Sequence, residues 1–175
     1  RTGRMPNGDS GPLFGVGSYL EVSDAADLSP STTGKFTFEC WLRPDVLDFR
    51  DGESDSGYVY WMGKGEPTQF EYAGRMYSTT SPGEVNDRRN RISAYGWVPS
   101  GGLGTGAYFQ DLITAGQWIH VVVIFNLETR EDWPLGSVEI WRDGVRRQKV
   151  SMTEYDTVMV AGTAPLRIGT RNMGS

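Results

Sequence analysis

Apolar residues in this chain recur at every second position in many short runs, and the spacing of an amphipathic helix is nearly absent. Side chains of a β-strand point alternately to opposite faces, so this spacing predicts strands with one face in a core. Nine runs predict strands, a number typical of a two-sheet sandwich: 19–22, 36–43, 58–62, 71–77, 91–98, 117–125, 137–142, 145–150 and 166–169.

Turn residues separate these runs. Asp143 and Gly144 lie between two alternating runs and supply the positive φ angles of a type I′ hairpin. Most of the 23 glycines and 9 prolines fall between runs, which suits an antiparallel sheet with many reversals. Gly102, Gly104 and Ala107 match a dinucleotide-binding fingerprint, but that motif needs a preceding strand and a following helix. Because neither is predicted, we interpret this segment as a flexible or tight loop.

Length, charge and rare residues exclude several classes of function. A chain of 175 residues without a break in composition predicts one domain over 1–175. A net charge of −5 opposes general binding to nucleic acid. The longest strongly apolar run, 119–125, is far shorter than the roughly 20 residues of a membrane span, so no membrane insertion is expected. With Cys40 and His120 each the sole residue of its type, neither a disulfide framework nor a zinc site of several His or Cys ligands is available.

Several segments, in this order and spacing, resemble one family. Segments 17–22 and 36–44 resemble the opening of laminin G-like domains of the concanavalin A-like lectin and glucanase group. Segment 116–121, with Trp118 and His120, resembles the central strand of that family, and 138–144 and 165–169 resemble the hairpin and late strand that follow. The resemblance implies an all-β fold: a two-sheet antiparallel jelly-roll sandwich of the concanavalin A-like type.

The resemblance also implies a range of functions. Domains of this group bind sugars, glycosaminoglycans or proteins, often with calcium, and some relatives cleave glycans; the fold alone does not choose between these functions. Our leading hypothesis is an extracellular or cell-surface, non-catalytic module that binds carbohydrate or another surface polymer. The alternatives are a structural or assembly subunit whose sandwich pairs with neighbouring chains, and a glycan-cleaving enzyme.

Candidate catalytic residues are few. Glycan-cleaving relatives alternate two glutamates around an aspartate on one strand, because cleavage needs an acid and a nucleophile on either side of the bond. The nearest pair here, Glu139 and Asp143, has the wrong spacing and runs into a turn. His120 lacks an accompanying nucleophile motif and is expected to pack or hydrogen-bond locally. Cys40 alternates with apolar residues, which predicts an inert buried thiol.

Aromatic residues are the more informative candidates for a binding site. In the run 91–98, aliphatic residues and glycine occupy the even positions, which leaves Tyr95 and Trp97 on the other face. If the aliphatic face is core, the aromatic face is exposed and forms a groove in which sugar rings stack on flat side chains. The alternative is that loops cover this face and the rings form a second core. The ligand-binding candidates are Trp41, Arg91, Tyr95, Trp97 and Tyr108.

Two charged clusters suggest ligands of opposite sign. Arg88, Arg89 and Arg91 carry guanidinium groups that can bind sulfate or carboxylate, although such runs are more often solvated. The acidic loop that begins at Asp48 includes Asp51 and Asp55, whose carboxylates are hard oxygen ligands suited to calcium. Their spacing is not that of an EF-hand, and solvated charge is the alternative.

The end of the chain predicts an unpaired sheet edge. The family usually continues after the late strand with an aromatic-rich closing strand, whereas this sequence stops at Ser175. An uncovered edge presents unpaired backbone groups and favours self-association. Three segments are candidates to cover this sheet edge: the N-terminal stretch 1–16, a strand from another subunit, or a C-terminal segment that follows Ser175. We expect the third.

Overall fold

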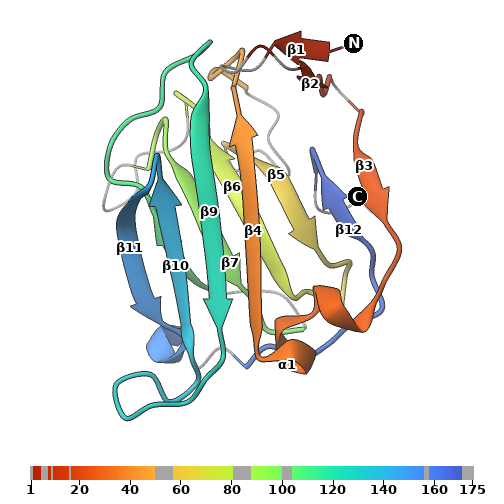
Figure 1. Ribbon diagram of the computed structural model, residues 1–175, viewed down its shortest axis with the longest axis vertical. Coiled ribbons are helices and arrows are strands. Elements are labelled where there is room, and N and C mark those ends of the chain that lie inside the picture. Colours follow the sequence, from red (N-terminus) through yellow and green to blue (C-terminus); the bar gives the residue numbers. More distant parts are fainter. Residues whose placement is uncertain are drawn as a thin grey trace.

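Two antiparallel sheets face each other across one apolar core (Figure 1). The computed structural model describes residues 2–4, 8, 10–15, 17–49, 57–80, 88–99, 104–155 and 158–170. One sheet has six strands in the order β3-β12-β5-β6-β7-β8, and the other has four in the order β11-β10-β9-β4. This arrangement confirms the predicted jelly-roll sandwich.

The strands have three to eight residues, and the helical turns have three or four. The six-stranded sheet contains β3 (Leu20–Val22), β12 (Leu166–Ile168), β5 (Tyr58–Lys64), β6 (Tyr72–Tyr77), β7 (Ile92–Gly96) and β8 (Thr105–Tyr108). The four-stranded sheet contains β11 (Val145–Ser151), β10 (Ser137–Arg142), β9 (Ile119–Asn126) and β4 (Lys35–Leu42). A separate two-stranded sheet pairs β1 (Thr2–Arg4) with β2 (Ser10–Pro12), and the helical turns are η1 (Ala26–Leu28), α1 (Pro30–Thr33) and η3 (Met152–Tyr155).

Each of the nine predicted runs contains a strand, and the predicted hairpin is confirmed. Asp143 and Gly144 both have positive φ angles, 51° and 78°, as a type I′ turn between β10 and β11 requires. The loop interpretation of the glycine-rich segment is wrong for its second half, because Thr105–Tyr108 forms β8. Gly106 lies against the ring of Tyr95, so its lack of a side chain serves close packing in a sheet.

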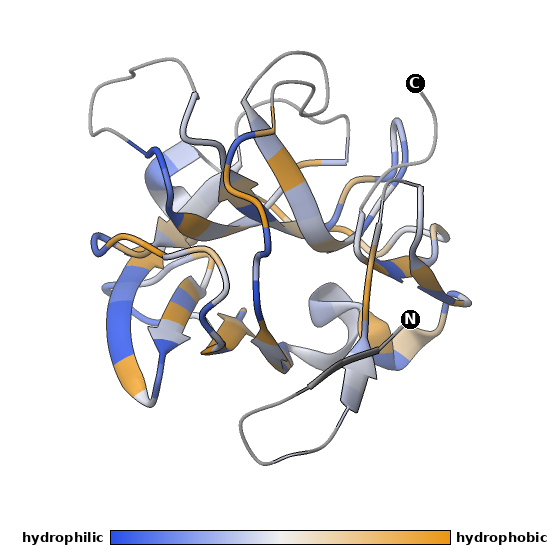
Figure 2. Cartoon of the chain, turned by 90° about the horizontal axis from the view of Figure 1, so that it is seen from above, coloured by the Kyte–Doolittle hydropathy of each residue, from blue (hydrophilic) through white to orange (hydrophobic). Residues whose placement is uncertain are grey.

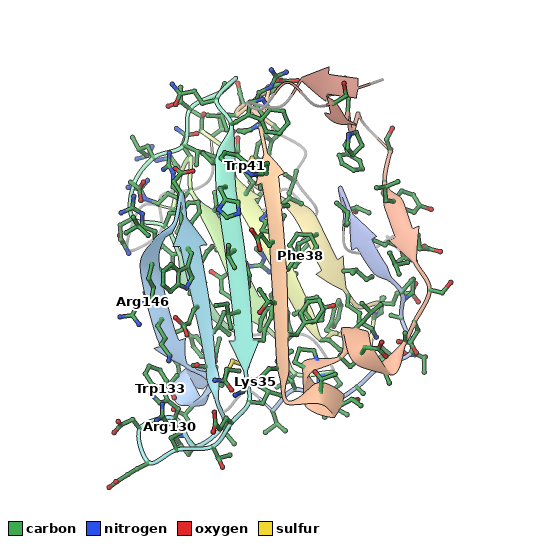
Figure 3. All side chains as sticks on the ribbon, viewed as in Figure 1. Lys35, Phe38, Trp41, Arg130, Trp133 and Arg146 are labelled. Atoms are coloured by element: carbon green, nitrogen blue, oxygen red, sulfur yellow. The ribbon has the colours of Figure 1, made fainter. Side chains whose placement is uncertain are left out.

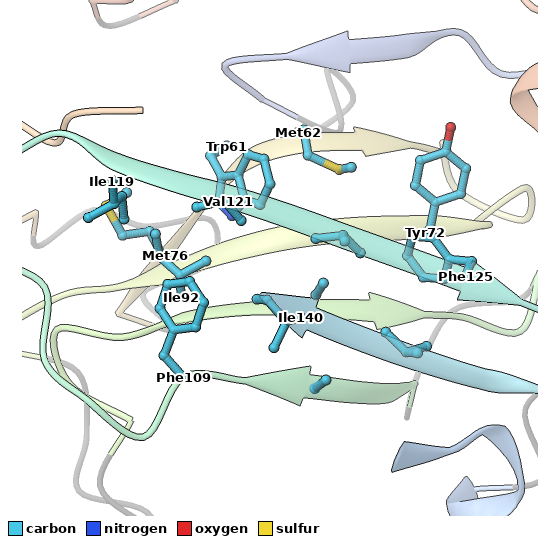
Figure 4. Close-up of a cluster of buried hydrophobic side chains, with 14 of the residues drawn as sticks. Trp61, Met62, Tyr72, Met76, Ile92, Phe109, Ile119, Val121, Phe125 and Ile140 are labelled. Atoms are coloured by element: carbon cyan, nitrogen blue, oxygen red, sulfur yellow. The ribbon is translucent and has the colours of Figure 1, made fainter. Parts of the chain in front are cut away.

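The core lies between the sheets and is built from the inward face of each strand. On β9, alternate residues from Ile119 to Phe125 are buried and the residues between them are partly exposed. Figure 4 shows these side chains meeting Met62, Tyr72 and Ile92 of the six-stranded sheet. Seen from above, the two layers both carry apolar residues (Figure 2). Each fully buried side chain of this kind contributes about 1.5–3 kcal/mol to stability.

A bulge in β5 brings two consecutive residues, Trp61 and Met62, to the core face of the sheet. The pairing of β5 with β6 shifts register between Tyr60 and Met62. Tyr60 points away from the core and Trp61 points into it, over Gly74, as in a regular strand; the bulge lets the next residue, Met62, face the core as well. Trp61 also makes an edge-on contact with Phe38 of β4, with ring centroids 5.6 Å apart.

The six-stranded sheet extends beyond the edge of the four-stranded sheet. Among the described strands, β4 pairs only with β9, and no described strand of its layer lies over β3. The inward-facing Leu20 and Val22 of β3 are therefore 48% and 45% exposed. The N-terminal stretch does not pair with this edge in its described part, because β2 pairs with β1.

Candidate functional site

The outer face of the six-stranded sheet carries a group of aromatic side chains, which we call the aromatic cluster. Its members come from alternate positions on β5, β6 and β7 and from the segments beside them. Pairing brings them together: Tyr58 lies opposite Tyr77, and Tyr60 lies opposite Arg75. The cluster consists of Tyr58, Tyr60, Phe70, Tyr77, Tyr95 and Trp97.

Most of the aromatic cluster is buried, which corrects the expectation of an exposed aromatic groove. Tyr95 and Trp97 do lie opposite the core face of β7, but they are only 7% and 5% exposed. Rings pack against rings: the centroids of Tyr95 and Trp97 are 5.7 Å apart, and Tyr58 lies 5.6 Å from Tyr60. Tyr95 and Trp97 therefore belong to a second core, which was the alternative interpretation. Tyr58 and Phe70 are partly exposed.

Arg75 lies at the centre of the aromatic cluster. Its guanidinium carbon is 4.1 Å from the ring centroid of Tyr58 and 4.5 Å from that of Trp97, with Tyr95 and Tyr60 at 5.0 and 5.3 Å. Such placement over ring faces stabilises a cation electrostatically. Nη2 donates a hydrogen bond of 3.0 Å to the Tyr60 hydroxyl, and Nε is buried without a hydrogen-bond partner. Arg75 is partly exposed, whereas all the remaining residues of β6 are buried.

A second guanidinium, that of Arg88, adjoins the aromatic cluster. Its Nη1 donates to the hydroxyls of Tyr95 and Tyr77 at 3.2 and 3.5 Å, and these hydroxyls are 3.1 Å apart. Burial alone would raise the pKa of Tyr77, but the charge of Arg75, the hydrogen bond with Tyr95 and the charge of Arg88 together lower this pKa. Arg88 also lies 5.7 Å from the ring centroid of Tyr108. Two guanidinium groups, those of Arg75 and Arg88, therefore lie in or beside the aromatic cluster.

Among the described residues Arg75 has no carboxylate beside it, in contrast to Arg167 and Arg142. Arg167, on the same outer face, donates to Glu21 and Glu66, each at 2.9 Å. Arg142 lies 2.6 Å from Asp111. No ion pair joins Arg75 to an acidic residue of the described ranges. A half-buried charge without a counter-ion is costly, because the protein interior screens it poorly.

A cleft of about 310 Å³ opens beyond the Phe70 end of the aromatic cluster. The backbone of Phe70 donates to Pro99, which lines the cleft, and its ring lies 6.4 Å from Trp97. Thr68, also in the lining, has a φ of 72°, a strained value for a β-branched residue and one that often accompanies a functional loop. The lining residues are Thr68, Gln69, Pro99, Val160, Ala161, Gly162 and Thr163.

A fully buried ion pair fixes one wall of this cleft. Lys64 and Glu71 are both shielded from solvent and contact each other, and Lys64 also lies 2.8 Å from Asp24. Gly162 bonds to both through its backbone: its N–H donates to Glu71 at 2.9 Å, and its carbonyl accepts from Lys64 at 3.0 Å. The wall is therefore held by charge-assisted hydrogen bonds, which are stronger than neutral ones.

Trp41 lies on the opposite side of the molecule from the aromatic cluster. It is on the outer face of the four-stranded sheet, near one end of β4 (Figure 3), and is 45% exposed. Its ring centroid is 5.1 Å from that of His120, and His120 Nε2 is 2.8 Å from a Glu39 oxygen. His120 thus packs and hydrogen-bonds locally. Glu139, on the same outer face, contacts Lys149 at 3.4 Å.

The remaining predicted site residues occupy several different settings. Tyr108 lies on β8 beside Arg88, on the same outer face as the aromatic cluster. Arg91 donates to the backbone carbonyls of Gln110 and Arg89, each at 2.8 Å, and so joins two loops. The structure therefore brings Tyr95, Trp97 and Tyr108 together and separates Trp41 from them.

Of the proposed calcium ligands, only Asp48 lies within the described residues. Its Oδ1 accepts a hydrogen bond of 3.4 Å from Thr80. Asp51 and Asp55 lie outside the described residues. Within the described ranges, no group of three or more His, Cys, Asp or Glu side chains could hold a metal ion. Nor does any helix there have the length and apolar character of a membrane span.

Sequence reasoning missed Arg75 and its neighbours Tyr58 and Tyr60 on β5. The signal was present: Tyr58 and Tyr60 alternate with Val59, and Arg75 alternates with Tyr77 in the next run. When a positively charged residue in a strand lies on the same sheet face as aromatic residues of the neighbouring strand, the pattern predicts a cation packed against aromatic rings. Finding it requires knowledge of which strands are neighbours.

Comparison with known proteins identifies the family. Residues 14–175 match the family model of Laminin G 3, described as the concanavalin A-like lectin/glucanases superfamily. Because the match spans most of the chain, the protein belongs to this family. Among curated proteins, no sequence matches the chain.

Solved structures similar to this chain include a pentraxin and a glucuronan lyase. The native heptameric SAP-like pentraxin from Limulus polyphemus is 13% identical, with a TM-score of 0.50, and the match covers 78% of this chain and 52% of the pentraxin. The endo-beta-1,4-glucuronan lyase from the fungus Trichoderma reesei is 12% identical, with a TM-score of 0.45, and the match covers 77% of this chain and 55% of the lyase. The chain therefore spans about half the length of each.

Proposed function

We propose that the protein is a non-catalytic carbohydrate-binding module whose ligand lies on the outer face of the six-stranded sheet. Membership of a superfamily of lectins and glucanases supports a carbohydrate-related role. The observation that carries the choice of face is Arg75, a partly exposed cation enclosed by aromatic rings. Binding sites for small ligands combine apolar walls with a few polar groups in this way.

Different residues of this face would have different roles. The partly exposed rings of Tyr58, Phe70 and Tyr108 offer flat surfaces on which the C–H face of a sugar can stack. The buried rings of Tyr95 and Trp97 hold Arg75 in place. The cleft beyond Phe70 is large enough to receive a neighbouring sugar unit.

A pair of alanine variants tests the proposal and the choice of face. Tyr58→Ala removes a partly exposed ring from the aromatic cluster, and Trp41→Ala removes an exposed ring from the opposite face of the sandwich. A glycan array with each folded variant should show weaker binding for Tyr58→Ala and unchanged binding for Trp41→Ala. If no glycan binds the unmodified protein, or if only Trp41→Ala weakens binding, the proposal is wrong.

A second candidate function is assembly through the edge of β4. The exposure of Leu20 and Val22 beyond this edge favours it, because an uncovered apolar face next to an unpaired strand is a site for strand addition. Mass spectrometry under native conditions distinguishes the two functions. A stable oligomer would support assembly, and a monomer at high concentration would leave only the binding module.

Calcium and an extracellular location also belong to the proposal. Calcium would bind the acidic loop at Asp48, Asp51 and Asp55, with modest affinity because a surface loop orders its ligands at a cost. A thermal-shift titration should show stabilisation by calcium that Asp51→Ala removes. No effect of calcium on either protein would exclude the site. A module that binds polymeric glycans is expected outside the cell or at its surface.

A further inference from the structure

We infer that the glycan bound on this face is acidic, and that Arg75 binds its carboxylate or sulfate group. This inference rests on the proposed function and narrows it to one class of ligand. It gives Arg75, which the sequence analysis did not single out, the central role in recognition.

The first argument is the charge balance of the site. The chain as a whole has a net charge of −5, yet Arg75 and Arg88 both lie in or beside the aromatic cluster. Arg75 has no carboxylate partner among the described residues, whereas Arg167 on the same sheet face has two. An incoming anion would supply the missing counter-charge, and the surrounding rings would strengthen the attraction by excluding water.

The second argument is that Arg75 retains free hydrogen-bond donors. A guanidinium carries five N–H groups, and the structure accounts for one of them, the bond from Nη2 to Tyr60. Nη1 makes no hydrogen bond to a described residue and remains available to a ligand, whereas Nε is buried and faces the protein. A planar oxyanion can accept two parallel bonds from such a group, a geometry that neutral hydroxyls do not match as well.

The third argument is access. The rings around Arg75 are mostly buried, while the arginine itself is partly exposed in a strand whose other residues are buried. Ring walls around a partly open cation admit a small charged group that projects from a sugar. The face would therefore bind the acidic substituent at Arg75 and place the sugar ring against Tyr58.

A purely structural role for Arg75 makes a different prediction. If the guanidinium only fills space between the rings, its replacement lowers stability and leaves the relative affinity for acidic and neutral glycans unchanged. If it binds an anion, the replacement removes the preference for acidic glycans in protein that is still folded. The ratio of the two affinities separates these roles, because loss of folding reduces both affinities alike.

The experiment measures binding of three polysaccharides by calorimetry: a polyuronate, a sulfated polysaccharide and a neutral β-glucan. The variants are Arg75→Gln, Arg75→Lys and, as a matched control, Arg146→Gln on the outer face of the four-stranded sheet. Arg75→Gln should weaken binding of the acidic ligand by about tenfold or more, the loss expected when a charge-assisted hydrogen bond is removed. Arg75→Lys should keep part of the affinity, and Arg146→Gln should match the unmodified protein.

Each outcome decides a different point. Failure of all three polysaccharides to bind overturns the proposed function. Equal binding of neutral and acidic polysaccharides, or acidic binding that survives Arg75→Gln, overturns this inference and leaves the proposed function standing. The preferred acidic polysaccharide identifies carboxylate or sulfate as the bound group. If Arg75→Gln does not fold, Arg75→Lys and the loss of affinity of the unmodified protein at high salt carry the test.

Discussion

The two outer faces of the sandwich follow the same alternation of residues and yet differ in kind. On the four-stranded sheet, outward charges pair with one another, as Lys35 does with Glu128 at 3.2 Å, and Trp41 is exposed. On the six-stranded sheet, the outward rings of Tyr95 and Trp97 are buried and enclose the Arg75 guanidinium, which pairs with no carboxylate of the described residues. The first face is a solvated surface, and the second is the face on which we propose the binding site.

The difference also separates two sources of free energy. Exposed ion pairs contribute little to stability, because water and salt screen them. Buried rings contribute through the apolar area that they remove from water and through their contacts with each other. Changes on the six-stranded face should therefore cost far more than matched changes on the four-stranded face.

The largest expected difference is between two tryptophans. Trp97→Ala should lower the free energy of unfolding by about 3–5 kcal/mol, because it leaves a cavity among buried rings. Trp41→Ala removes a 45% exposed ring and should cost less than about 1 kcal/mol. Urea denaturation of both variants measures the contrast. Equal losses would mean that the aromatic cluster is not a second core.

A smaller difference is expected between two glycines. A methyl group at Gly106 would overlap the ring of Tyr95 and the carbonyl of Ala94, whereas one at Gly15 would meet open space. Gly106→Ala should cost about 1–3 kcal/mol through overpacking, and Gly15→Ala should have little effect. The melting temperatures of the two variants test this. A neutral Gly106→Ala would show that the rings next to β8 can shift freely.

Much of the fold was predictable because alternation is a local property. The runs that became β9 and β10 could be assigned to strands, and their buried faces identified, from their own residues. The hairpin at Asp143 could also be predicted from local sequence, because Asp and Gly favour the positive φ angles that this turn requires. Strand β8 was missed because its glycine-rich sequence is typical of a loop. The reason for Gly106 is the ring of Tyr95 on β7, which packs against it, and the sequence of β8 does not reveal that contact.

The site was predictable only in part, because burial depends on neighbours that the sequence does not name. Trp41 and Tyr95 have the same pattern, an aromatic residue opposite an apolar face, yet one is exposed and the other is buried. The role of Arg75 depends on the pairing of β6 with β5 and β7, which no residue of β6 specifies. The calcium site and the closing strand after Ser175 stay predictions.

A third comparison concerns two titrating groups, Tyr77 on the six-stranded face and Glu128 on the four-stranded side. Burial would raise the pKa of Tyr77, but the charge of Arg75, the hydrogen bond with Tyr95 and the charge of Arg88 lower it overall. Arg75→Gln should therefore raise the pKa of Tyr77, and added salt should change it little, since buried charges are poorly screened. Absorbance of the tyrosinate ion against pH, with Tyr77→Phe to assign the signal, measures it. An unchanged pKa would mean that the guanidinium does not act on this hydroxyl.

The smallest effect is expected at Glu128 on the exposed four-stranded side. The hydrogen bond and charge of Lys35 lower the pKa of Glu128 from its ordinary value of 4.5. Because the folded-state pKa is lowered, the pair stabilises the protein at pH values above 4.5, and this contribution is lost as the pH falls through the lowered pKa. Lys35→Gln should raise the Glu128 pKa toward its ordinary value, since Lys35 is the main cause of the lowering, and high salt should have a similar effect in the unmodified protein, since the pair lies in water. Carboxyl chemical shifts followed against pH measure both changes. If the Glu128 pKa resisted salt as firmly as that of Tyr77, the two faces would not differ in solvation as the structure indicates.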